Sequence, residues 1–129
     1  MSTSATGTFD LTSWRPEEAA EGSLLGRARI TKSFQGDLTG TSTVDMLTVA
    51  DTAGNPVAYV AVELVTGELG GRKGSFALQH SAPGSHGERL AIQVVPGTGT
   101  GDLTGITGTL EIVRPEDGSH SYTLEYTLV

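Results

Sequence analysis

The segment Gly36-Asp37-Leu38-Thr39-Gly40 decides the fold, because the same five residues recur at 101–105. Residues 67–71 (Gly-Glu-Leu-Gly-Gly) are a relaxed copy, so successive copies begin 31 and then 34 residues apart. In such a turn the glycines can adopt positive φ values or bulges, and the acidic side chain can accept hydrogen bonds from the turn's own amides. The leucine side chain can then plug one end of the interior that the neighbouring strands enclose.

Between these turns, hydrophobic residues alternate with polar or small ones, which is the period of half-buried strands. The clearest case is HSYTLEYTL (120–128), where histidine, tyrosine and leucine share one face and serine, threonine and glutamate share the other. The alternation predicts strands at about 3–13, 24–35, 41–50, 56–66, 74–82, 88–95, 107–114 and 119–129. The connections between them are too short for parallel crossovers, so the strands are expected to be antiparallel.

Three similar turns at nearly constant spacing favour a closed barrel over a two-sheet sandwich, and closure also removes exposed sheet edges. We therefore predict an all-β fold: a single eight-stranded antiparallel up-and-down barrel over residues 1–129, with little or no helix. The one helical candidate is Pro16–Leu25, but Gly22 and Ser23 interrupt it, so a turn or loop is expected there.

Composition supports this fold and excludes several function classes. The chain has 129 residues, about one domain, and its 18 glycines disfavour a helical bundle. A net charge of −7 gives no electrostatic basis for binding nucleic acid or a membrane surface. The absence of cysteine excludes disulfides and thiolate chemistry. The N-terminal segment lacks a signal peptide's basic and apolar regions, and no apolar run is long enough to span a bilayer, so a cytoplasmic location is expected.

Several longer stretches resemble a known family. They are Trp14 with Pro16-Glu17-Glu18, TKSFQGDLTGTST (31–43), ELVTGELGGRKGSFALQH (63–80), VVPGTGTGDLTGITG (94–108) and HSYTLEYTL (120–128). Together they resemble a bacterial family of unknown function, number 3224 in the domain-of-unknown-function series. Its members resemble the allene oxide cyclase and dirigent barrels. The resemblance implies a small eight-stranded barrel, often oligomeric, with a central cavity. It assigns no reaction, although the wider superfamily includes proteins that steer the cyclisation of reactive apolar intermediates.

The common catalytic and cofactor motifs are missing. The glycines at 97, 99 and 101 continue into another turn and strand, with no helix to bind a phosphate, so they indicate a structural turn. The three histidines, His80, His86 and His120, show no metal-ligand spacing, and His86 lies in a polar turn. No nucleophile elbow is present. We expect no metal and no cofactor.

Glu63 and His80 are the candidate catalytic residues. Glu63 lies in the most apolar strand, and His80 ends the alternation Phe76, Leu78, His80. Since the turn at 67–71 joins their strands, the two side chains can face each other. A carboxylate beside an imidazole in an apolar barrel would make an acid–base pair. A register slip of one residue would instead put them on opposite faces, and a structural ion pair or an outward-facing glutamate stays open.

Aromatic and basic residues complete the candidates. Trp14, Tyr59, Tyr122 and Tyr126 are predicted to bind an apolar ligand, with simple core packing as the alternative. Arg27 and Arg29 lie on the strand face opposite Ala28, Ile30 and Phe34 and are expected outside the barrel. If the interior were polar, the two arginines would instead face inward and could grip a carboxylate.

Two functions remain open. In the first, the barrel binds a small, mostly apolar molecule in its cavity, and in its enzymatic form it is a cyclase- or isomerase-like barrel that uses Glu63 and His80. In the second, a non-catalytic barrel with a filled core self-associates as a homo-oligomer through its apolar strand Val57–Val65. A solvent-accessible pocket of several hundred Å³ would favour the first function.

Overall fold

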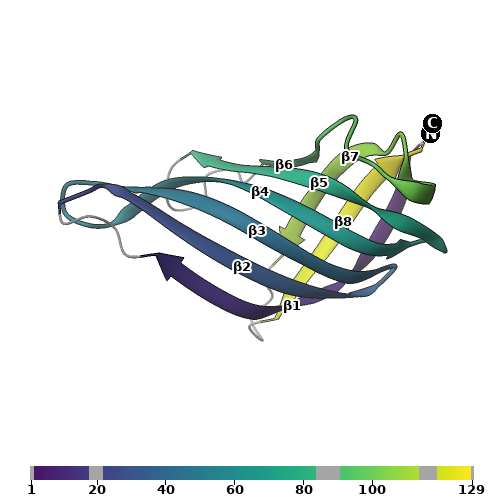
Figure 1. Cartoon of the computed structure of the whole chain (residues 1–129), viewed down its shortest axis with the longest axis horizontal. Coiled ribbons are helices and arrows are strands. Elements are labelled where there is room, and N and C mark those ends of the chain that lie inside the picture. The colour runs from purple at the N-terminus through teal and green to yellow at the C-terminus, as the bar shows by residue number, and fades with distance from the viewer. Residues whose placement is uncertain (1, 18–21, 84–90, 114–118, 129) are drawn as a thin grey trace.

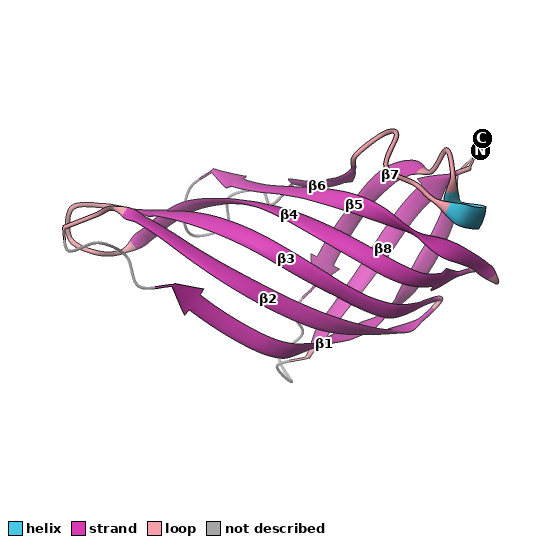
Figure 2. Ribbon diagram, in the orientation of Figure 1, coloured by secondary structure: helices cyan, strands magenta, loops and turns pink. Residues whose placement is uncertain are grey.

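The computed structural model describes residues 2–17, 22–83, 91–113 and 119–128. Within them the chain forms eight strands and one short 3-10 turn, η1 (Figures 1 and 2). The elements are β1 (Thr3–Glu17), β2 (Leu25–Gly36), β3 (Leu38–Ala50), β4 (Pro56–Leu69), β5 (Arg72–Pro83), β6 (Ala91–Val94), η1 (Gly101–Leu103), β7 (Thr107–Val113) and β8 (His120–Thr127). None of the described helical residues makes a segment long and apolar enough to cross a membrane.

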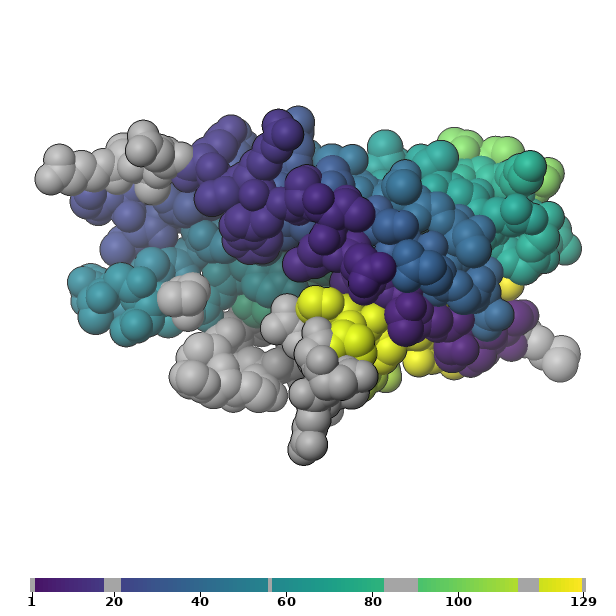
Figure 3. All heavy atoms as spheres, turned by 90° about the horizontal axis from the view of Figure 1, so that it is seen from below, coloured from purple at the N-terminus to yellow at the C-terminus, as the bar shows by residue number. Residues whose placement is uncertain are grey.

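The strands pair in chain order and close into one barrel, because β8 returns to pair with β1. Every pairing is antiparallel, and at the closing seam Thr3 pairs with Tyr126 and Phe9 with His120. Figure 3 shows this seam from outside, with β1 lying beside β8. The predicted eight-stranded antiparallel up-and-down barrel is therefore confirmed.

The strand boundaries differ from the predictions mainly at β1. β1 continues to Glu17 instead of ending near residue 13, while β6 covers Ala91–Val94, and residues 88–90 of the strand predicted at 88–95 lie outside the described part of the chain. Within the candidate helix, Pro16 and Glu17 thus belong to a strand, while residues 18–21 lie outside the described part of the chain. Pro16 fits there because, among the described residues, the β1–β8 pairing extends only to Phe9, so no described strand pairs with Pro16 on that side of β1.

The leucines of the three repeated turns plug one end of the barrel, which we call the closed end. Leu38, Leu69 and Leu103 are fully buried and belong to one core cluster, as the repeat predicts. At the β4–β5 turn Gly70 and Gly71 both have positive φ, 58° and 83°, as tight antiparallel hairpins prefer. Figure 1 shows these turns and η1 at the same end as the start of β1 and the end of β8.

Hydrogen bonds to β1 and β8 hold the β2–β3 turn in place. The Tyr122 hydroxyl accepts a hydrogen bond from the Leu38 N–H (2.9 Å) and donates to the Gln35 carbonyl oxygen (3.1 Å). The Asp37 carboxylate accepts a hydrogen bond from the Thr6 N–H (2.9 Å), so it binds β1 and not the amides of its own turn. The closed end is consequently tied to both β1 and β8.

A bulge in β1 turns Trp14 toward the interior. Phe9 and Leu11 pair with Phe34 and Lys32 of β2, but the register shifts between Leu11 and Ser13. After the shift Trp14 pairs with Ile30, whose side chain is buried inside the barrel. A bulge of this kind inserts one residue and exchanges the two faces of a strand. Without it, the alternation that buries Phe9 would point Trp14 outward.

The outer face carries both charged and apolar residues. Arg27 and Arg29 lie outside, as expected, where they form ion pairs with Glu17 (3.8 Å) and Asp45 (3.1 Å). Beside them, outward-facing aliphatic side chains of β3 and β4 are exposed: Leu47, Val49, Val60, Val62 and Leu64. We call these five residues the outer apolar stripe. Three of the five residues, Val60, Val62 and Leu64, lie in the segment Val57–Val65, through which the chain is predicted to self-associate.

Candidate functional site

A buried ionic cluster lies across the middle of the barrel. The Glu63 carboxylate from β4 is only 1 % exposed and has three partners. Its Oε1 accepts hydrogen bonds from Nε2 of His80 (2.7 Å) and Nζ of Lys32 (3.3 Å), and its Oε2 accepts one from the Ser42 hydroxyl (2.6 Å). Among the described residues, every fully buried side-chain nitrogen and oxygen has a hydrogen-bond partner. The cluster is therefore a satisfied network of charged and polar groups in an otherwise apolar interior.

Strand register brings these residues together. Along β4 and β5, Glu63 pairs with Leu78, and His80 pairs with Ala61. The register thus differs by two residues from the one in which Glu63 and His80 are directly opposite. Since side chains alternate with a period of two, a shift of two residues keeps both on the inner face, where diagonal neighbours still reach each other.

The partners determine the protonation of the cluster. Burial would raise the pKa of Glu63, but the hydrogen bond from His80, the charge of Lys32 and the hydrogen bond from Ser42 together outweigh it, so the pKa lies below its usual value. Glu63 is therefore a carboxylate at neutral pH. Because a carboxylate can only accept, Nε2 of His80 donates this hydrogen bond, which leaves Nδ1 as the ring nitrogen that does not contact Glu63.

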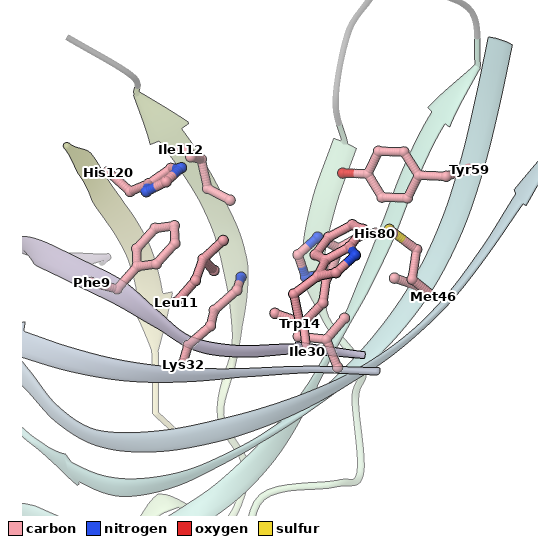
Figure 4. A pocket seen from close by; sticks show the side chains of 12 residues that line it. Phe9, Leu11, Trp14, Ile30, Lys32, Met46, Tyr59, His80, Ile112 and His120 are labelled. Carbon is pink, nitrogen blue, oxygen red and sulfur yellow. The ribbon is translucent and has the colours of Figure 1, made fainter. Parts of the chain in front are cut away.

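Two members of the cluster, Lys32 and His80, form the floor of a pocket of about 370 Å³, and Glu63 and Ser42 lie behind them. The pocket lies in the half of the barrel away from the closed end, and we call this half the open end. It is lined by Phe9, Leu11, Trp14, Ile30, Lys32, Val44, Met46, Tyr59, Ala61, His80, Ile112 and His120. In Figure 4, Phe9, Ile112 and His120 lie on one side and Trp14, Met46 and Tyr59 on the other, with the Lys32 ammonium group between them.

Most of the pocket wall is apolar, and its polar side chains are Lys32, His80, His120 and the Tyr59 hydroxyl. Lys32 has its Nζ 4.6 Å from the centre of the Phe9 ring, a favourable cation–π position. The Phe9 ring also stacks on His120, with centroids 5.0 Å apart. A second pocket of about 440 Å³ shares Trp14, Met46 and Tyr59 with the first and continues toward the rim. A small apolar ligand would thus meet one ammonium group at the floor.

Comparison with known proteins identifies the family. The family model described as "Protein of unknown function (DUF3224)" matches residues 5–126. The chain belongs to the DUF3224 family. A solved DUF3224 structure from Shewanella oneidensis MR-1, a protein of unknown function, is 37% identical, with a TM-score of 0.87 over 100% of this chain and 99% of that one. No curated protein matches the sequence.

The DUF3224 barrel separates the four predicted ligand-binding aromatic residues into two groups. Trp14, which is 53 % exposed, and Tyr59 line the pocket at the open end. Tyr122 and Tyr126 are buried with the core cluster that fills the closed end, and neither lines the pocket. The structure therefore brings Glu63 and His80 together beneath Trp14 and Tyr59, and it places the other two tyrosines in the packed core.

Lys32, Ser42 and His120 belong to this site of the DUF3224 barrel, although sequence reasoning did not select them. A signal for Lys32 is visible in the sequence, because it lies on the same strand face as Ala28, Ile30 and Phe34. A lysine on an apolar face needs a partner inside, and Glu63 is that partner. His120 gives a similar signal, because it shares a strand face with Tyr122 and Leu124, whereas Ser42 gives none, since serine is common on exposed strands.

Metal ligands are not grouped in the described part of the DUF3224 barrel. None of its His, Asp and Glu side chains gather in sets of three or more that could hold a metal ion. His86 lies outside the described residues. Glu63 and His80 therefore meet as an acid–base or ion-pair arrangement rather than as members of a described metal centre.

Proposed function

We propose that this protein binds a small, mostly apolar molecule in the open-end pocket, with the polar end of the molecule beside Lys32 and His80. One observation carries the proposal: an apolar pocket of about 370 Å³ has a buried, fully hydrogen-bonded ionic cluster at its floor. Ligand pockets typically combine apolar walls with a few convergent polar groups in this way. The resemblance in fold between members of the family and the allene oxide cyclase and dirigent barrels points toward the same class of ligand.

A variant that fills part of the pocket with a larger side chain tests this proposal. Met46 points into the pocket, whereas its neighbour Leu47 points outward. We expect Met46→Phe to weaken binding of octan-2-one, an apolar probe, by about tenfold or more, because the added ring occupies ligand volume. The single tryptophan, Trp14, lines the pocket, so its fluorescence emission reports occupancy directly.

Leu47→Phe is the matched control, since it adds a similar volume on the outside of the same strand. It should leave the affinity within about twofold, which is a difference of well under 1 kcal/mol. Equal losses of affinity in the two variants, or none in either, would mean that the probe does not enter the pocket.

A catalytic role is the second candidate, and the Glu63–His80 hydrogen bond of 2.7 Å favours it. A carboxylate that orients an imidazole while the other ring nitrogen faces substrate is a common base arrangement. With a ketone bound, Nδ1 of His80 would take a proton from the carbon next to the carbonyl. The electron pair left behind would move to the carbonyl oxygen beside the Lys32 ammonium group.

This role predicts exchange of hydrogen for deuterium in a bound ketone. In D₂O, the wild-type protein should introduce deuterium next to the carbonyl of octan-2-one about 10²–10⁴ times faster than the His80→Gln variant. Proton NMR of the ketone measures the rate. Equal exchange rates with the wild-type protein, with His80→Gln and in buffer alone would contradict the catalytic role and leave only the proposed ligand binding.

Self-association remains the other proposal, and the outer apolar stripe supports it. Its exposed side chains on β3 and β4 form a surface of the kind that packs against a second copy. The interior is nevertheless not filled, because the pocket occupies the open end. The pocket therefore favours ligand binding over a purely structural barrel, while both functions could coexist in one molecule.

A further inference from the structure

The charges at the pocket floor are already balanced. Lys32 carries one positive charge and Glu63 one negative charge, and these two side chains form an ion pair with 3.3 Å between Nζ and Oε1. Both charged side chains are buried, at 8 % and 1 % exposure, so water screens them little. A ligand bound at this floor meets an ion pair that is neutral as a whole.

This balance disfavours an anionic ligand. A carboxylate placed against Lys32 would lie close to the Glu63 carboxylate as well, since Oε1 of Glu63 is 3.3 Å from the lysine Nζ. Two buried negative charges beside one positive charge leave a net charge with little solvent to stabilise it, which is costly. The chain also has a net charge of −7, which opposes the approach of anions.

The same floor favours a neutral hydrogen-bond acceptor. An ammonium group has three N–H donors, and the hydrogen bond from Lys32 to Glu63 uses one of them. A ketone or hydroxyl oxygen can accept from Lys32 without adding charge. From this balance we infer that the pocket selects neutral molecules with an oxygen acceptor at the inner end and discriminates against carboxylates of the same length. This inference rests on the proposed binding function and names its ligand class.

Two ligands of equal length test the inference. In titrations at pH 8 followed by Trp14 emission, octan-2-one should bind the wild-type protein at least about tenfold tighter than octanoate. Octanoate binding as tightly as octan-2-one would overturn the inference but leave the proposed function intact. No emission change with either ligand would overturn both.

A variant that changes the charge at the pocket floor separates the effect of that charge from the preference of any apolar pocket for an uncharged ligand. Glu63→Gln keeps the shape of the side chain but removes its charge, which leaves Lys32 as an uncompensated cation. We expect octanoate to gain at least about tenfold in affinity relative to octan-2-one in this variant. An unchanged ranking in a folded Glu63→Gln protein, checked by circular dichroism, would contradict the inference.

Ser42→Ala is the matched control, since it removes a hydrogen bond to the same carboxylate without changing any charge. It should keep the wild-type ranking of the two ligands. A reversal in Ser42→Ala as large as that in Glu63→Gln would show that disturbance of the network, and not charge, sets the preference. If Glu63→Gln does not fold, the wild-type ranking still decides the inference.

Discussion

Lys32→Met should destabilise the barrel by about 3–5 kcal/mol at neutral pH. Methionine nearly matches the length and apolar stem of lysine, so packing against Phe9 is largely retained. What is lost is the ammonium group 3.3 Å from Oε1 of Glu63, and a buried carboxylate is left with only His80 and Ser42 as partners. Urea unfolding followed by circular dichroism measures the loss.

The pH dependence of this loss follows from the carboxylate. In the wild type the pKa of Glu63 lies below its ordinary value of 4.5, so its stabilising contribution is present above about pH 4.5 and is lost as the pH falls through the folded-state pKa. Removing the Lys32 charge raises that pKa. The stability difference between wild type and Lys32→Met should therefore be largest near neutral pH and shrink in acid.

An exposed ion pair on the same strand provides the control. Arg29 lies 3.1 Å from Asp45, but both side chains are more than half exposed, at 65 % and 61 %. Arg29→Met should cost about 1 kcal/mol or less, because solvent screens the pair. The double variant Lys32→Met/Glu63→Gln should recover most of the loss, since it removes the unpaired charge. If Lys32→Met lowered the free energy of unfolding by no more than Arg29→Met does, Lys32 and Glu63 would not depend on each other as a buried ion pair.

Leu69→Ala should cost about 2–5 kcal/mol, the second large effect. Leu69 is completely buried in the plug of the closed end, together with Leu38 and Leu103. Its removal leaves a cavity between turns whose backbones are held by hydrogen bonds and tight glycine geometry, so the surroundings cannot collapse to fill it. Urea unfolding again gives the free energy.

Leu64→Ala is the control for this prediction. Leu64 lies on the same strand but faces outward and is 55 % exposed, so truncating it should change stability by about 0.5 kcal/mol or less. Ligand binding should survive in Leu69→Ala, because the plug and the pocket occupy opposite halves of the barrel. Similar losses for the two leucines would show that the repeated turns do not form a packed plug.

The fold could be predicted from the sequence because its signals are local. The alternation in 120–128 and the repeated turns depend only on neighbouring residues, and they gave the strand order and the closed end. The outward position of Arg27 and Arg29 follows from the same alternation. Local pattern does not reveal the bulge between Leu11 and Ser13, and so the inward position of Trp14 had no visible cause in the sequence.

The candidate site depends on register, which is not local. Glu63 and His80 were predicted as a possible pair, but only the β4–β5 pairing places both on the inner face. Lys32 joins them from β2, 31 residues before Glu63. Whether a tyrosine lines a pocket or fills a core depends on which half of the barrel it occupies, and this distinguishes Tyr59 from Tyr122.

The proposed ligand is a small neutral molecule that occupies the open-end pocket. This occupancy is tested most directly by mapping the amide chemical shifts of the ¹⁵N-labelled protein as octan-2-one is added. The account predicts that the shifts gather at residues of the pocket, above all Lys32, His80 and Trp14. Shifts confined to Val60, Val62 and Leu64 of the outer apolar stripe, or none at all, would contradict it.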